Sequence, residues 1–535
     1  MKYLHLFDIY QPTKATEKQM PTTIPSHRKD SLEILQELVQ VASPQKLQKV
    51  KPIIAYDKEQ KLRKLYDGMR LKKWRSESEA IRSIYGKQGS PNAFAKLKSD
   101  LSEKLVSDIL LINVNAADVP EAKKALRDCL VKYHTALLMY RFTPFHKAPD
   151  NILEKIFPKC LKYEFTELII GISDIMAWKY KLHSDLKKGA YYEQILLNHL
   201  KIQEFECRGK IFLGNIYAQY ACSRSFKPEI VQQATHYLQI LDSANLPCET
   251  QKTIYFKRML EVICLMSKFN YLKTAQLCED TIDYFESKSF TTPSILRAFY
   301  FQAIASYTYL REPEKGYLLL KKCNLLTTGG GSFNWFKLQE LTIIMALYAE
   351  DYQRAAHIFL ETTSHERFAK MPSHLLEYWK LLEAMLSVVE SSGLIRSHPG
   401  RPFQIRFSSL ANSVPQLIRD KRGLNFAVHL LRFFTLVQKG NAKSYQNYDD
   451  CLEQLGNYVN RYCRDESMQR TRWIYQLLCQ ISRHGFVKKA VLHDPETKIF
   501  MQHLQKTPYD ITDANLDIEI IPFDHFFNII CSKLQ

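Results

Sequence analysis

The chain has little glycine and lacks the short motifs that mark several common catalytic sites. Only 17 of its 535 residues are glycine, against about 7% in average proteins. Sheet-rich folds need glycine in their many tight turns, so this scarcity favours helices. The sequence contains no H-E-x-x-H, G-x-S-x-G, G-x-G-x-x-G or Walker pattern, and tyrosines and carboxylates without such a pattern define no reaction. We therefore expect a protein that is not an enzyme and that uses no cofactor.

Paired-cysteine motifs and long apolar runs are missing as well. The twelve cysteines include no C-x-x-C pair, which excludes zinc-ribbon and thioredoxin spacings. Most of them lie among apolar helical residues, as Cys264 does, and this predicts buried free thiols in a reducing compartment. The uncharged stretch 298–310 is too short and too polar to span a bilayer, and residues 1–7 are too short an apolar run for a signal peptide. These features predict a cytoplasmic protein without a membrane span.

What the chain does have is positive charge, with a formal net charge of +18. Such a balance favours nucleic acid, an anionic membrane or an acidic protein as partner. The alternative is a lysine-rich soluble protein with solvated helix faces, and the spread of the charge along the whole chain favours this interpretation.

Helical periodicity begins near Ser31 and continues almost without pause. Proline repeatedly stands where a helix would begin, a position at which its missing N–H is harmless; these prolines are Pro91, Pro120, Pro228, Pro293, Pro313 and Pro495. Near the end, alternation at Leu516, Ile518 and Ile520 predicts a short extended segment, after which Pro522 opens a last helix. The predicted organisation is an irregular segment 1–30, a basic helical module 31–115, a helical-repeat solenoid 116–392, a loop 393–404, and a helical region 405–535 with a capping tail.

Four stretches repeat a helix–turn–helix pattern about every forty residues. A small residue early in each second helix marks the pattern, with a further position four residues later: Ala234/Leu238, Ala275/Glu279, Gly316/Leu320 and Ala355/Phe359. Successive small residues are 41, 41 and 39 positions apart. A fixed period in this range is typical of stacked helical hairpins, and the small residues suit close helix crossings. The predicted fold class is therefore all-α.

The repeat pattern resembles the tetratricopeptide repeat superfamily over about residues 210–365. The segment Glu350-Asp351-Tyr352-x-x-Ala355-x-x-x-Phe359 is similar to a stretch of that family, as are Tyr300-x-x-Ala303-x-x-x-Tyr307 and Leu213-Gly214-x-x-Tyr217. The resemblance implies a tetratricopeptide-like α-solenoid that binds a protein or peptide partner in its concave groove and carries out no catalysis.

A basic stretch precedes the repeats. Residues 57–104 hold 13 Lys and Arg against 7 Asp and Glu. Three predicted helices with a glycine-bearing turn are loosely similar to a helix-turn-helix unit. The candidate polyanion-binding residues are Lys72, Lys73, Arg75, Arg82, Lys87, Lys96 and Lys98. Acids such as Asp100 and Glu103 are interleaved on the third helix, so a module that packs on the solenoid is favoured over one that contacts nucleic acid.

Two further patterns resemble ligand sites. His357, Glu361 and His365 follow i,i+4 spacing on one helical face, but a solvent-facing polar stripe explains them better than a metal site. The glycines of 329–331 are followed by no Lys-Ser/Thr pair, so we expect no phosphate loop. The sequence thus predicts a non-catalytic interaction scaffold for a protein partner, without metal. The alternative is a nucleic-acid-binding regulator that uses the 57–112 module.

Overall fold

The fold was analysed in a computed structural model of the chain. The structure describes residues 35, 39, 60–71, 73–74, 76–86, 89–109, 119–144, 146–222, 228–327, 330–396, 403, 425–439, 445–464, 468–509 and 519–535. Within these ranges the chain forms helices joined by turns, with no strand. The predicted all-α class is confirmed.

The described part of the chain divides into two compact units, one that ends at Leu200 and one that runs from Lys201 to Gln535. The boundary falls within one long helix, α8 (Leu186–Cys222). The finer predicted boundaries, at residues 30, 115, 392 and 404, stay predictions.

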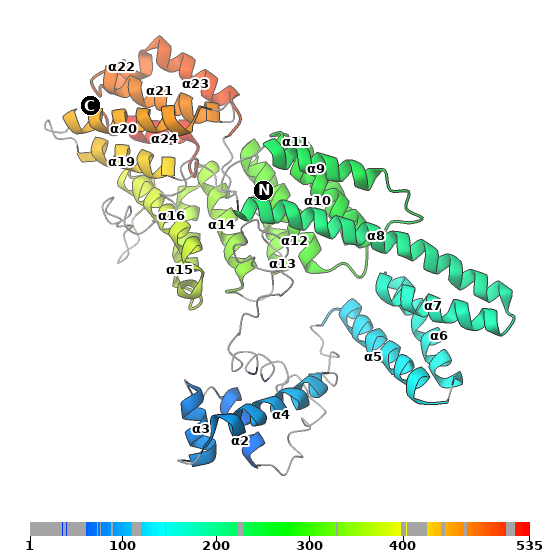
Figure 1. Ribbon diagram of the computed structural model, residues 1–535. Helices are drawn as coiled ribbons and strands as arrows, with labels where there is room; N and C mark the ends of the chain where they lie inside the picture. The colour runs from blue at the N-terminus through cyan, green and yellow to red at the C-terminus, as the bar shows by residue number, and fades with distance from the viewer. Residues whose placement is uncertain are drawn as a thin grey trace. The chain divides into compact units, whose positions relative to one another are not determined.

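The first unit contains two sets of helices with separate apolar cores. The first set is α2 (Gln60–Arg70), α3 (Glu77–Tyr85) and α4 (Pro91–Ile109), and the second is α5 (Glu121–Phe142), α6 (Lys147–Lys162) and α7 (Thr166–Leu182), followed by α8 (Figure 1). Leu65, Phe94 and Leu101 belong to the core of the first set, and Phe157 and Ile172 to that of the second.

The second unit continues with helices that pack on their neighbours along the chain. These are α9 (Pro228–Asp242), α10 (Gln251–Ser267), α11 (Tyr271–Glu286), α12 (Pro293–Leu310), α13 (Pro313–Leu325), α14 (Phe333–Tyr348), α15 (Tyr352–Ser364) and α16 (Ser373–Ser391). The C-terminal helices are α19 (Asn425–Lys439), α20 (Tyr445–Tyr462), α21 (Gln469–Arg483), α22 (Lys488–His493), α23 (Pro495–Lys506) and α24 (Phe523–Cys531). Figure 1 shows α24 among these last helices.

Three successive helical hairpins close with the same turn. Phe269, Arg311 and Glu350, which end the first helices α10, α12 and α14, all have a left-handed backbone with φ of 56° to 57°. In each turn the next residue donates its N–H to a carbonyl five residues earlier, as Asp351 does to Ala346 at 2.9 Å. These six-to-one bonds satisfy carbonyls at the helix end. Glycine usually occupies such a position, so these turns were not visible in the sequence.

The small residues of the predicted pattern lie inside the protein. Ala234, Ala275 and Ala355 are fully buried, and Gly316 is buried on α13. A Cβ atom at Gly316 would collide with the Met345 thioether of α14. The expectation that small residues occupy close helix contacts is therefore confirmed at this position, where no larger side chain fits without a shift.

Parts of two of the first helices, α12 and α14, are enclosed on all sides. Residues 298–308 of α12 form an unbroken buried run of three helical turns, and α14 is buried throughout 343–348. Side chains of the second helices α11, α13 and α15 remain exposed at regular intervals. Any surface that this part of the chain presents therefore comes mainly from the second helices.

Most predicted helix ends agree with the structure. Pro293, Pro313 and Pro495 occupy the first turn of their helices, whereas Pro120 precedes α5 as its N-cap. The last helix begins directly after Pro522, as predicted. Residues 1–30, most of the loop 393–404, and the predicted extended segment at Leu516 and Ile518 lie outside the described residues.

Thiol burial also follows the prediction. Eight of the eleven described cysteines are buried free thiols, Cys479 is intermediate, and Cys207 and Cys248 are exposed. No helix in the described part of the chain is long and apolar enough to cross a membrane.

Candidate functional sites: the basic module and a C-terminal polar network

The predicted polyanion-binding residues come from three separate segments of the first helical set. Lys73 follows α2, Arg82 lies on α3 and Lys96 on α4, and all three are exposed. Lys98 differs because its ammonium pairs with Glu77 of α3 and also lies 5.4 Å from the centre of the Phe94 ring. Lys98 therefore joins two helices of the module. Lys72, Arg75 and Lys87 lie outside the described residues.

The outward face of α4 carries both signs of charge. Lys96 and Glu103 are exposed, and Asp100 is half-buried. Phe94, Leu97 and Leu101 occupy the opposite, buried face. On the described part of α4, the basic Lys96 therefore shares its face with the acidic Asp100 and Glu103.

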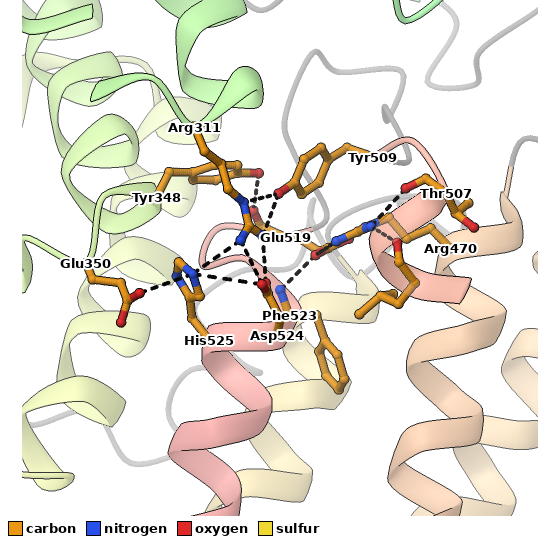
Figure 2. A network of polar contacts seen from close by, with 11 residues as sticks. Arg311, Tyr348, Glu350, Arg470, Thr507, Tyr509, Glu519, Phe523, Asp524 and His525 are labelled. Atoms are coloured by element: carbon orange, nitrogen blue, oxygen red, sulfur yellow. Dashed lines mark hydrogen bonds and ion pairs between the residues drawn. The ribbon is translucent and has the colours of Figure 1, made fainter. Parts of the chain in front are cut away.

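The densest polar network of the second unit surrounds Arg311, at the turn between α12 and α13. Its guanidinium donates to both carboxylate oxygens of Asp524 at 2.7 Å, a bidentate pair, and to the hydroxyl of Tyr509 at 2.9 and 3.1 Å. The neighbouring His525 lies 3.3 Å from the carboxylate of Glu350. Figure 2 shows these groups facing one another across the start of α24.

A second guanidinium, that of Arg470 on α21, completes the network. It pairs with Glu519 and donates to the carbonyls of Leu504 and Thr507, the latter at 2.9 Å. The Oε2 atom of Glu519 accepts from the Arg470 guanidinium at 3.0 Å and from the backbone N–H of Phe523 at 2.8 Å, and the second bond caps α24 (Figure 2). Arg470 also stacks 4.3 Å from the centre of the Tyr509 ring. The aromatic ring of Tyr509 thus lies against one arginine while its hydroxyl binds another.

Two hairpin turns take part in this network through their left-handed residues. Arg311 and Glu350 both have positive φ, and their side chains contact Asp524 and His525, which are adjacent in α24. Tyr348, two residues before Glu350, donates its hydroxyl to the Glu519 carbonyl at 2.9 Å. The C-terminal segment is therefore fastened to the ends of α12 and α14.

Electrostatics favour the charged forms of these pairs. Burial raises the pKa of Asp524, but the Arg311 guanidinium outweighs burial and leaves that pKa below its ordinary value. Burial lowers the pKa of Arg470, and Glu519 more than compensates, so the net pKa is raised. Burial raises the pKa of Tyr509 despite the two guanidinium groups, so its hydroxyl is neutral near pH 7. The charges satisfy one another, which suits a joint between helices better than a site for substrate.

The pattern formed by His357, Glu361 and His365 gathers no further ligating side chain within the described residues. His357 and Glu361 are exposed on α15, while His365 is half-buried, with its ring 5.2 Å from that of Trp335. No group of three or more metal-ligating side chains occurs in the ranges that the structure describes.

Sequence reasoning did not find the C-terminal network. Its members are spread over more than 200 residues, and apart from Glu350, which belongs to the tetratricopeptide-like stretch 350–359, they share no spaced motif. The available signal was the charged Glu519 between Ile518 and Ile520 in an apolar tail, since a buried acid requires a cation. That signal does not identify which arginine pairs with Glu519.

Comparison of the chain with protein-family models, with curated proteins and with solved structures gives no match.

Proposed function

We propose that this chain is a non-catalytic helical-repeat scaffold that binds a protein partner. The observation that carries the proposal is the set of three hairpins with one turn geometry, at Phe269, Arg311 and Glu350. Their spacing of about forty residues and their buried small residues are typical of repeat arrays, in which each hairpin packs on the next. Such arrays present extended surfaces that other proteins recognise. The arrangement as an α-solenoid is part of this proposal.

The second helices offer the surface best suited to a partner. The Arg354 guanidinium of α15 stacks 3.9 Å from the Tyr317 ring of α13, so these two second helices lie next to each other. Leu318 and His357 each follow the small residue of their hairpin by two positions, and both are exposed. Because α12 is enclosed, we favour this α13–α15 face over a groove lined by the first helices.

The C-terminal network supports a scaffold role through rigidity. It ties the turns at Arg311 and Glu350 to α24 by charge-assisted hydrogen bonds. A surface that is ordered before binding loses less conformational entropy when a partner docks. A fixed hairpin array is therefore suited to selective recognition.

The proposal is tested by affinity capture with the full-length chain and two double variants. Leu318→Glu/His357→Glu changes the α13–α15 face. Ile499→Glu/His493→Glu is a matched control on α22 and α23, because these side chains are also exposed. A protein that is retained by the wild type and by the control, and is lost with the α13–α15 variant, supports the proposal. Equal capture by all three chains contradicts the proposed surface.

Binding of nucleic acid is the second candidate. Lys73, Arg82 and Lys96 are exposed on the first helical set and are positioned to meet phosphates. The mixed charge of α4 and the pairing of Lys98 with Glu77 favour the scaffold.

A further inference from the structure

An unusual group of exposed apolar side chains lies at one end of α5–α8, in the first unit. Phe142 is 78% exposed, Leu186 70%, Trp178 69% and Leu182 66%. Phe142 and Leu182 are the last residues of α5 and α7, and Leu186 is the first residue of α8. Large apolar side chains with this exposure at neighbouring helix ends are typical of an interaction site.

The helix ends are held together by one carboxylate. Asp150, in the first turn of α6, accepts from the Tyr140 hydroxyl of α5 at 2.5 Å and pairs with the Lys179 ammonium of α7 at 2.7 Å. Phe142 follows Tyr140 by two residues, and Trp178 immediately precedes Lys179. The last turns of α5 and α7 therefore both lie beside the first turn of α6.

The start of α8 is fastened to the same end. The rings of Tyr180 and Tyr192 stack with centroids 5.7 Å apart, and Lys181 pairs with Glu193 at 2.9 Å. Leu182 and Leu186 occupy the turn that joins α7 to α8. We call Phe142, Trp178, Leu182 and Leu186 the apolar tip.

Positive charge surrounds the apolar tip. Residues 141–147 and 179–188 hold six Lys and Arg and one acid, Asp185. Three of the basic side chains, Arg141, Lys147 and Lys187, are exposed and make no ion pair with any residue that the structure describes. The tip thus combines protruding apolar groups with basic groups directed to solvent.

We propose that the apolar tip docks this protein onto an anionic membrane surface. Tryptophan, phenylalanine and leucine insert at the boundary between headgroups and acyl chains, while lysine and arginine meet lipid phosphates. These side chains are 66–78% exposed, so a protein partner would need a matching concave surface, whereas a fluid bilayer needs none. The docking requires no spanning helix. It goes beyond the proposed binding of a protein partner, which uses α13 and α15.

The test is co-sedimentation of the full-length chain with vesicles of phosphatidylcholine alone or with about 30% phosphatidylserine, an anionic lipid. One variant, Phe142→Ser/Trp178→Ser/Leu186→Ser, removes apolar groups without changing charge. Leu325→Ser/Val487→Ser/Ile499→Ser is the matched control, since these side chains are also exposed but lie in the second unit. Circular dichroism establishes that both variants keep the helical fold.

The wild type and the control should bind the anionic vesicles at physiological ionic strength, and the tip variant should bind at least about tenfold more weakly. Absence of wild-type binding would overturn the proposal. Equal binding by the tip variant would also overturn it, because adsorption would then follow from the net charge of +18 alone. Self-association of the wild type that the tip variant loses, without vesicle binding, would assign the tip to a second copy of the chain. Capture of a protein through the α13–α15 face is unaffected by any of these outcomes.

Discussion

Arg470 and Glu519 form an ion pair in which the two side chains are only 3% and 4% exposed, although 49 residues separate them along the chain. Glu519 also accepts the backbone N–H of Phe523, so one carboxylate neutralises a buried guanidinium and caps the last helix. The pair therefore links α21 to the start of α24.

Removing one member of this pair should be much more damaging than replacing both. We expect Glu519→Ala to lower the free energy of unfolding by about 3–5 kcal/mol, because it leaves the Arg470 charge buried without a partner. The double change Arg470→Met/Glu519→Met should cost clearly less, since no buried charge remains. Denaturant unfolding measures the free energy lost by the single and by the double variant. Hydrogen exchange of the α24 amides measures the loss in α24 itself. Equal losses for the single and double variants would show that the pair is not a coupled unit.

The turn at Arg311 allows backbone strain to be separated from the ion pair. Arg311→Ala and Arg311→Gly both remove the contact with Asp524, but only glycine adopts the left-handed backbone without strain. We expect both variants to be less stable than the wild type, with the glycine variant about 1 kcal/mol more stable than the alanine variant. Thermal unfolding of the two variants provides the comparison. An alanine variant at least as stable as the glycine variant would contradict the positive φ of Arg311.

The pairing of Asp524 predicts a specific pH dependence. Its pKa is lowered in the folded chain because the Arg311 guanidinium outweighs burial. The stabilisation is thus fully present above the unfolded pKa, about 3.9, and is lost as pH falls through the lower folded value. The stability difference between the wild type and Asp524→Asn should be constant from pH 7 to about pH 5 and should narrow below about pH 4. Chemical denaturation at several pH values measures this stability difference. A difference that widens in acid would contradict the lowered pKa of Asp524.

The basic module is tested by charge reversal at two exposed positions. We expect Arg82→Glu/Lys96→Glu to leave the affinity for duplex DNA, and its dependence on salt, essentially unchanged, because α4 carries acids on the same face. If either side chain did bind a phosphate, its reversal would reduce the slope of log affinity against log salt by about 0.9. A salt titration by fluorescence anisotropy measures this slope. If the wild type binds DNA at physiological salt and the variant's slope is smaller by about two, the nucleic-acid function would be favoured.

Local patterns in the sequence predicted local features of the fold. Pro522 predicted the start of the last helix, and Phe523, Phe526 and Phe527 of that helix are buried. The small residues Gly316 and Ala355 were predicted to lie at helix contacts, and both are buried. Such features depend on neighbours within one or two helical turns, which periodicity reports directly.

Features that depend on distant residues were not predicted. The left-handed turns at Phe269, Arg311 and Glu350 lack the glycine that usually marks them. The apolar tip was also missed, because Trp178 and Leu182 lie on the face of α7 opposite to its buried residues. Periodicity records that a residue is apolar, but it does not tell whether that residue enters the core or faces solvent.

The most direct test of the scaffold proposal is the affinity of the purified chain for the protein obtained in the capture experiment. Biolayer interferometry should give a dissociation constant at least about tenfold weaker for Leu318→Glu/His357→Glu than for the wild type, as expected when two contacting side chains are replaced by carboxylates. The control Ile499→Glu/His493→Glu should bind like the wild type, and both variants should unfold at the wild-type temperature. An unchanged dissociation constant for the α13–α15 variant would contradict the proposal that the second helices of the hairpins form the binding surface.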